Sequence, residues 1–113
     1  MARRNLNSSR SSPADQGDRQ MDIGKIGVYA VLESMTVNET LEFARTIEKR
    51  GYRTLWIPEA SGRDPFSHAA YLLSHSERLS VATGIANIWA RDAIAMASAA
   101  RTVSEISDGR FVL

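Results

Sequence analysis

The chain has 113 residues, of which 43% are hydrophobic and 24% charged, with a formal net charge of +1 and no cysteine. These values fit one globular domain or part of one, and the lack of cysteine excludes disulfides and thiolate metal sites. The near-neutral charge gives no reason to expect a nucleic acid or an anionic membrane as partner. The sequence shows no apolar run of the roughly 18 residues that a transmembrane helix needs and no export signal, which favours the cytoplasm.

Residues 1–21 are rich in Ser and Arg and have almost no apolar side chain beyond Leu6. Such a segment cannot bury enough apolar surface to offset the entropy lost on ordering, so we predict a disordered leader. Arg3 and Arg4 resemble the start of a twin-arginine export signal, but no apolar segment follows them. We expect the folded part to occupy residues 22–113.

The first strand and helix have clear boundaries. Residues 26–31 are a short apolar run that predicts a buried strand. Thr36 and Glu39 then form an S/T-x-x-E capping box, and Gly51 suits the left-handed position after a helix. Between them, the buried stripe of the predicted helix consists of Val37, Leu41, Ala44 and Ile47.

A second strand is predicted at residues 54–57, where Pro58 ends it. Asp64 and Pro65 then have the types preferred at the N-cap and first position of a helix. The buried stripe of this second helix is predicted to be Phe66, Ala69, Ala70 and Leu73.

Residues 79–91, LSVATGIANIWAR, begin as a β-branched apolar run and then change character at Gly84. The run predicts a strand buried on both faces, as in a parallel sheet. Asn87 and Trp89 follow it, and an α/β protein places its ligands at such strand ends. An ordinary strand-to-helix connection is the alternative. A third helix over residues 92–107 has Met96, Ala99, Ala100 and Val103 on one face, and a fourth strand begins at residue 110.

This βαβαβαβ order predicts an α/β fold with a parallel sheet and right-handed crossovers. A doubly wound dinucleotide-binding sheet would have a glycine-rich first turn, but residues 31–34 read VLES. A (β/α)₈ TIM barrel has the same element order and typically about 250 residues. We therefore predict the N-terminal half of a (β/α)₈ barrel, truncated in its fourth strand.

Four segments carry a resemblance: GKIGVYAV, TLWIPEASGRDPF, TGIANIWARD and SEISDGRFVL. Together, over residues 22–113, they resemble the N-terminal part of the luciferase-like monooxygenase superfamily, in its coenzyme F420-dependent oxidoreductase branch. The resemblance implies a (β/α)₈ barrel that binds a deazaflavin, coenzyme F420, or alternatively FMN, at the carboxyl ends of its strands. It also implies an enzyme that forms a homodimer and acts on a small organic substrate by hydride transfer or monooxygenation.

Carried onto this chain, the resemblance assigns Gly84 and Ile85 to a strand-end bulge with a non-prolyl cis peptide against the cofactor ring. Ala86 and Asn87 would follow in the cofactor-lining strand end. The Asn87 amide can both donate and accept hydrogen bonds, which suits the edge of a pyrimidine-like ring. An Asx turn is the alternative role for Asn87.

Trp89 and Arg91 complete the predicted cofactor site. Trp89 would either line the cofactor site or pack between barrel and helix. Arg91 would either attract a cofactor phosphate beside a helix N-terminus or form a surface salt bridge with Asp92 or Glu105. Trp56 is assigned to the core.

Glu59 is the predicted catalytic residue, because relatives carry an acidic residue at the end of the second strand. It would relay a proton or orient a substrate group, and a solvated carboxylate paired with Arg63 is the alternative. Relatives that act on alcohols or sugar phosphates often have a histidine at the next position, and Ala60 here puts that chemistry in doubt. His68 and His75 are expected to be surface or partly buried helix residues, without a metal site.

Two functional interpretations follow. The first is a luciferase-like oxidoreductase that is inactive as this fragment alone, because the later loops of the barrel are missing. The second is a non-enzymatic half-barrel, either an assembly module that pairs its open sheet with another half or a gene remnant.

Overall fold

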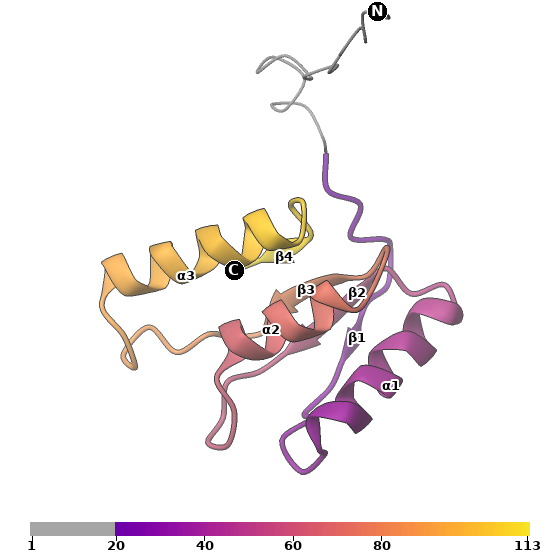
Figure 1. Ribbon diagram of the computed structural model, residues 1–113, viewed down its shortest axis with the longest axis horizontal. Coiled ribbons are helices and arrows are strands. Elements are labelled where there is room, and N and C mark those ends of the chain that lie inside the picture. Colours follow the sequence, from indigo (N-terminus) through magenta and orange to yellow (C-terminus); the bar gives the residue numbers. More distant parts are fainter. Residues whose placement is uncertain (1–19) are drawn as a thin grey trace, which may run out of the picture.

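The computed structural model describes residues 20–113, so nearly all of the predicted leader lies outside the described residues. The elements (Figure 1) are β1 (Val28–Tyr29), α1 (Val37–Lys49), β2 (Thr54–Ile57), α2 (Pro65–Ser74), β3 (Ser80–Thr83), α3 (Ala93–Ile106) and β4 (Phe111–Val112). The strands form one parallel sheet in the order β1-β2-β3-β4. The predicted alternation of strands and helices is confirmed, with a first strand shorter than expected.

Local capping fixes where the helices begin and end. The Glu39 carboxylate accepts from the Thr36 backbone N–H at 2.7 Å, and the Thr36 hydroxyl accepts from the Glu39 N–H at 3.3 Å, which closes the predicted capping box. The Asp64 and Asp92 carboxylates cap α2 and α3 by accepting from the Ser67 and Ala95 N–H groups, at 2.7 and 2.8 Å. Gly51 has φ +91°, so α1 ends at the left-handed residue that its sequence predicts.

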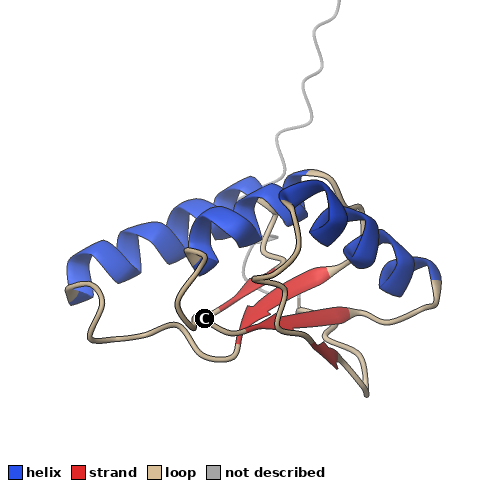
Figure 2. Ribbon diagram, turned by 90° about the horizontal axis from the view of Figure 1, so that it is seen from below, coloured by secondary structure: helices blue, strands red, loops and turns tan. Residues whose placement is uncertain are grey.

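All three helices cover one face of the sheet and leave the other free of helices (Figure 2). Because alternate side chains of a strand point to opposite faces, the register sorts the sheet residues into two rows. Leu55, Val81 and Phe111 lie in one row and belong to the buried core with the helices. The other row, on the helix-free face, consists of Tyr29, Trp56, Ala82 and Val112.

Three expectations about burial are corrected, the first two by this helix-free face. The first strand was expected to be buried, but Tyr29 and Val31 are each 60% exposed, because β1 is an edge strand with only one covered face. Trp56 was expected in the core, but it is half-buried on the uncovered face, in the row opposite Leu55. Val37 is also exposed, so the buried stripe of α1 begins after it, at Thr40 and Leu41.

His68 is buried, against the expectation of a surface or partly buried residue, because it lies where α2 contacts α1. The Thr40 hydroxyl donates to the Val37 carbonyl at 2.7 Å and lies 3.0 Å from His68 Nε2. Since that hydroxyl has one proton, His68 Nε2 is the donor in this pair. Burial lowers the pKa of His68 to about 4, with the nearby Arg63 charge as a second cause, so the imidazole is neutral at pH 7. His75 is exposed, as expected.

Within residues 20–113, no group of three His, Cys, Asp or Glu side chains could hold a metal ion. In the same residues, no helix has the length and apolar character needed to cross a membrane.

Candidate functional site

The segments that follow β1, β2 and β3 meet at the carboxyl edge of the sheet, where β3 continues into Gly84 and Ile85. The peptide bond between these two residues is cis, as the family resemblance implies. The Gly84 N–H donates to the Ile57 carbonyl at 2.8 Å, and the Ile85 carbonyl accepts from the Glu59 N–H at 3.0 Å. These two bonds extend the pairing of β2 and β3 beyond the strands and fix Gly84 against the end of β2.

Two aromatic rings lie beside Gly84 on the helix-free face. A Cβ added to Gly84 would lie 3.4 Å from Tyr29 Cε2 and 3.6 Å from Trp56 Cε3. Tyr29, Gly84 and Trp56 therefore form a continuous apolar surface at the strand ends, which we call the aromatic strip. Sequence reasoning missed both rings as site residues. The alternation of side chains along a strand could have identified them. Each ring comes directly after a residue that faces the helices, so it points to the opposite face.

Glu59 and Arg91 form a bidentate ion pair across two strand ends. Arg91 Nη2 lies 2.7 Å from Glu59 Oε1, and Arg91 Nη1 lies 2.9 Å from Glu59 Oε2. The two side chains are only 16% and 13% exposed, for arginine and glutamate respectively. Glu59 Oε2 also accepts from the Asn87 N–H at 2.6 Å. One carboxylate thus holds both the backbone and a side chain of the segment after β3.

Arg91 has further contacts that use the rest of its guanidinium. Nη1 donates to the Asn87 carbonyl at 3.1 Å, and Nη2 lies 3.4 Å from Asp64 Oδ1. The guanidinium carbon lies 5.0 Å from the centre of the Phe66 ring, a cation–π distance. Arg91 therefore joins the end of β2, the start of α2 and the segment before α3.

These partners differ from the predicted alternatives. The predicted salt-bridge partner of Arg91 was Asp92 or Glu105, but Glu105 pairs with Arg101 at 3.1 Å. Glu59 was given Arg63, but Arg63 Nη2 donates to the Met35 carbonyl at 2.6 Å instead. Sequence spacing favours near neighbours, whereas the actual Glu59–Arg91 pair depends on parallel strands that bring residues 32 positions apart together.

The electrostatics of this pair keep both groups charged. The hydrogen bonds from Arg91 lower the pKa of Glu59, and burial opposes this only in part. The same bonds raise the pKa of Arg91. Because both Glu59 oxygens already accept hydrogen bonds, the carboxylate serves here as a fixed anion. A contact between Arg91 and a cofactor phosphate would require the guanidinium to give up bonds to Glu59.

A second carboxylate ties the two preceding segments in the same way. Glu33, after β1, accepts from the backbone N–H groups of Ala60 and Ser61, after β2, at 3.2 and 3.0 Å. Backbone hydrogen bonding, that from Gly62 first, lowers the pKa of Glu33. A carboxylate therefore ties the segment after β1 to the segment after β2, and another ties that segment to the one after β3. In each case an arginine of the later segment also bonds to the earlier one. We call these contacts the rim ties.

The remaining predicted residues lie close to this site with different exposures. Asn87 Oδ1 accepts from the Trp89 N–H at 2.9 Å, which is the Asx turn given as the alternative. Ala86 is buried, whereas Ile85 and Trp89 are 74% and 91% exposed. Trp89 therefore does not pack between sheet and helix within residues 20–113. The rim ties bring Glu59, Asn87 and Arg91 together, and Gly84 lies beside them.

The family model described as luciferase-like monooxygenase matches residues 12–113. The chain belongs to this family. The match begins upstream of residue 22, inside the predicted leader, so similarity to the family extends further than the motifs indicated. The resemblance read from the four segments is confirmed.

Two relatives add detail. Over 72 residues, the chain is 31% identical to a protein of Methanolobus tindarius named 5,10-methylenetetrahydromethanopterin reductase, a match that covers 63% of the chain and 22% of that relative. The solved coenzyme F420-dependent tetrahydromethanopterin reductase of Methanopyrus kandleri aligns with a TM-score of 0.71 and 18% identity, over 77% of this chain and 25% of that one. The fold class predicted for the chain, an α/β half-barrel, is confirmed by this likeness. The chain spans about a quarter of the length of these luciferase-like relatives.

Proposed function

We propose that this chain is part of a coenzyme F420-dependent oxidoreductase and that its strand-end edge forms one wall of the deazaflavin site. The observation that carries the proposal is the aromatic strip, Tyr29–Gly84–Trp56, which presents an apolar surface at the edge where this family is expected to bind its cofactor. The relatives support the choice of cofactor, since the solved reductase is named as F420-dependent. FMN is the alternative.

The residues present fit a flat, partly polar ring. The half-buried Trp56 and the exposed Tyr29 offer aromatic faces, and Gly84 offers no side chain that would hold the ring away. Asn87 uses its carbonyl oxygen in the Asx turn, and its amide N–H groups donate no bond within the described residues, so they can serve the ring edge. When bound, F420 supplies a ring that gives or accepts a hydride. Ile85, Ala86 and Trp89 would complete the lining.

Glu59 and Arg91 act in this proposal as positioning residues. Glu59 orients the segment that carries Asn87 through its bond to the Asn87 N–H, and it does so as an ionised carboxylate. A role for Glu59 as a proton relay, or for Arg91 as a phosphate ligand, would require a rearrangement of their bidentate pair. We assign both residues to the support of the cofactor wall.

For the whole protein we propose hydride transfer on a small organic substrate, with monooxygenation as the alternative reaction, in a cytoplasmic homodimer. On its own, the 113-residue chain should show little or no turnover with reduced deazaflavin or FMN, since it covers about a quarter of the relatives' length. Turnover at rates typical of enzymes would contradict this expectation.

The test of the cofactor site is a fluorescence titration of the chain with coenzyme F420, and then with FMN. We expect Tyr29→Ala and Asn87→Ala to weaken F420 binding by about tenfold, the loss of one ring contact or hydrogen bond. Tyr52→Ala is the matched control, because Tyr52 lies at the opposite edge of the sheet. Equal binding by all three variants, or no binding by the unaltered chain, would contradict the proposal.

A non-enzymatic half-barrel is the second candidate function, and the exposure of Tyr29 and Val31 on the helix-free face favours it. Exposed apolar sheet surface is a surface for association. Sedimentation of the purified chain separates the two interpretations: a defined dimer without cofactor binding supports an assembly module, and a monomer that binds F420 supports the oxidoreductase.

A further inference from the structure

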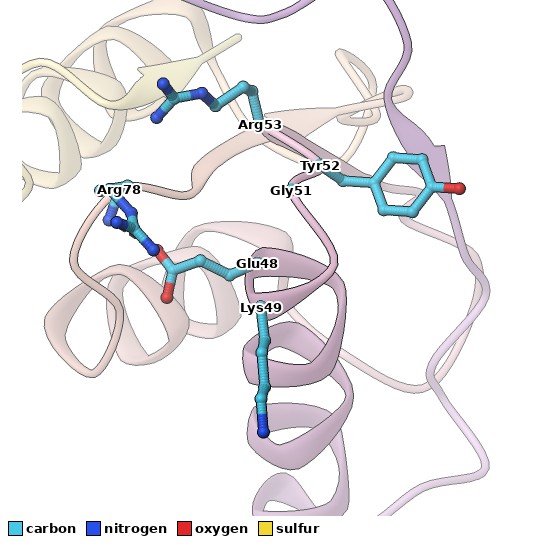
Figure 3. Close-up of a pocket in the computed structure, with 6 residues that line it drawn as sticks. All are labelled: Glu48, Lys49, Gly51, Tyr52, Arg53 and Arg78. Carbon is cyan, nitrogen blue, oxygen red and sulfur yellow. Dashed lines mark hydrogen bonds between the residues drawn. The ribbon is translucent and has the colours of Figure 1, made fainter.

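One feature outside the site proposed above is a hollow at the amino edge of the sheet. It has a volume of about 290 Å³, and its lining residues are Glu48, Lys49, Gly51, Tyr52, Arg53 and Arg78 (Figure 3). The side chains of Arg53 and Arg78 extend in different directions, and the Glu48 carboxylate accepts from the Arg78 and Leu79 N–H groups. The hollow therefore does not bring two cations to one anion. A stronger candidate for a binding surface is the exposed face of α3.

α3 is covered far less than the other helices. Of its 14 residues only Val103 is buried, whereas α1 has four buried residues and α2 has six. It lies at one edge of the helix layer, beside α2 (Figure 1). Its exposed residues are Ala93, Ile94, Ala95, Ala97, Ser98, Arg101, Thr102, Glu105 and Ile106. A surface helix ordinarily turns charged and polar side chains to water, so a mostly small and apolar exposed face indicates a surface for association.

Four of the exposed residues form one row along α3. Ile94, Ser98, Thr102 and Ile106 are spaced four apart, and side chains at this spacing form a ridge on a helix. The two isoleucines are 80% and 53% exposed, and the two hydroxyl residues between them are exposed as well. The Thr102 hydroxyl donates to the Ser98 carbonyl at 2.9 Å, so its proton is already used within the helix. We call this row the α3 ridge.

The α3 ridge has the same order of residue types from either end: an isoleucine, two small hydroxyl residues and an isoleucine. A two-fold interface needs such a self-complementary surface, because residue i of one copy contacts residue j of the other while j contacts i. In an antiparallel pair of α3 helices, the Ile94 end of each ridge would face the Ile106 end of the other. Charge does not oppose this pairing, because the charged residues of α3, Arg101 and Glu105, bond to each other within the helix at 3.1 Å.

We propose that α3 packs against α3 of a second copy of this chain, antiparallel, around a two-fold axis near residue 100. The inference names a surface for the homodimer proposed above, but it rests on α3 alone and not on the cofactor site. One helix from each copy makes a small interface compared with the roughly 1,200–2,000 Å² that stable complexes bury. We therefore expect the isolated chain to form a weak dimer whose population rises with concentration.

The first test is disulfide cross-linking, for which the chain is suited because it has no cysteine. A disulfide requires Cα atoms within about 7 Å of each other. When Ser98→Cys and Thr102→Cys chains are mixed in equal amounts and oxidised, the mixed dimer should exceed the two symmetrical dimers together. Random pairing would make these amounts equal, and intact mass separates the products. Equal amounts would overturn the proposal.

The second test is sedimentation over a range of chain concentrations. Ile94→Glu should weaken dimerisation by about tenfold or more, because it places a carboxylate against an apolar side chain of the other copy. The double variant Ile94→Glu/Ile106→Lys should recover affinity, because an antiparallel pair brings the two opposite charges together. Ile26→Glu is the matched control, since Ile26 is 72% exposed and precedes β1. Circular dichroism checks that each variant keeps its fold.

The following outcomes would also overturn the proposal. A chain that stays monomeric up to about 1 mM would mean that another segment or another protein covers α3. Weakening by Ile26→Glu and not by Ile94→Glu would place the association on the sheet. Failure of the double variant to recover affinity would exclude the antiparallel arrangement. A chain that binds F420 but does not cross-link contradicts this inference alone and leaves the proposed function intact.

Discussion

Arg91 and Glu59, which are 32 positions apart in the chain, face each other in a bidentate pair, in which Nη1 lies 2.9 Å from Oε2 and Nη2 lies 2.7 Å from Oε1. This geometry joins the end of β2 to the segment between β3 and α3. Because the same carboxylate also accepts from the Asn87 N–H, the pair controls where Asn87 lies. The ion pair is thus the contact through which the candidate cofactor wall keeps its shape.

Arg91→Ala should lower the free energy of unfolding by about 2 kcal/mol, because it leaves the poorly exposed Glu59 carboxylate without its main partner. Arg101→Ala removes an arginine from an exposed ion pair on α3 and should cost less than about 0.5 kcal/mol. Urea denaturation of both variants gives the comparison. A double-mutant cycle with Glu59→Ala should give a favourable coupling energy, and a coupling near zero would rule out the support role of the pair.

Acid should destabilise the fold through His68. Its pKa in the folded state is about 4, below the ordinary value of 6.5, so the stability linked to its neutral form is complete above pH 6.5. That stability is lost progressively as the pH falls from about 6.5 towards 4. Denaturation midpoints measured across this range should fall less steeply for His68→Gln than for the unaltered chain. His75→Gln, at the exposed C-cap of the same helix, should keep the original slope.

The two faces of the sheet should respond differently to truncation of side chains. Leu55→Ala should cost about 3 kcal/mol, because Leu55 is fully buried beneath the helices. Tyr29→Ala should cost about 1 kcal/mol or less in the isolated chain, because that ring is largely exposed on the helix-free face. Thermal denaturation of the two variants measures the difference. Equal costs would show that the helix-free face is covered in solution, for example by a second copy.

Gly27→Ala should displace Trp56. A Cβ at Gly27 would lie 2.7 Å from Trp56 Nε1 and 3.2 Å from the Thr54 carbonyl oxygen, so the indole has to move. We expect a loss of about 1–2 kcal/mol in stability, typical of overpacking, and a change in Trp56 fluorescence. The measurement uses a Trp89→Phe background, so that only Trp56 emits. Gly62→Ala, whose Cβ would come no closer than 3.4 Å to Glu33, should leave the emission unchanged.

The elements could be predicted from the sequence because their boundaries depend on local chemistry. The Thr36–Glu39 capping box, Asp64 as an N-cap and Gly51 after α1 each act within a few residues of their own position. Which face of a strand is covered is a different matter. Tyr29 and Trp56 lie on a face whose exposure depends on where the three helices pack. An apolar run in the sequence predicts a strand, but it does not predict which face of that strand the helices cover.

The partners of the candidate site residues were the least predictable part. Glu59, Arg91 and Asn87 were identified from a family resemblance, but the contacts among them span strands and loops that neighbour each other only after folding. His68 illustrates the same limit, since its burial depends on Thr40 in another helix. The spacing of residues along one helix predicts which of them share a face. It does not predict which other element packs against that face.

The rim ties have a consequence for the order in which the chain folds. The strands follow one another in space as they do in sequence, and the ties between strand-end segments join residues 27 to 32 positions apart. Each new strand, helix and loop can therefore dock on the unit just before it as the chain leaves the ribosome. Because these ties join neighbouring units, they favour stepwise assembly from the N-terminus. The edge that carries the aromatic strip would then take shape as soon as residue 91 has been synthesised and released from the exit tunnel.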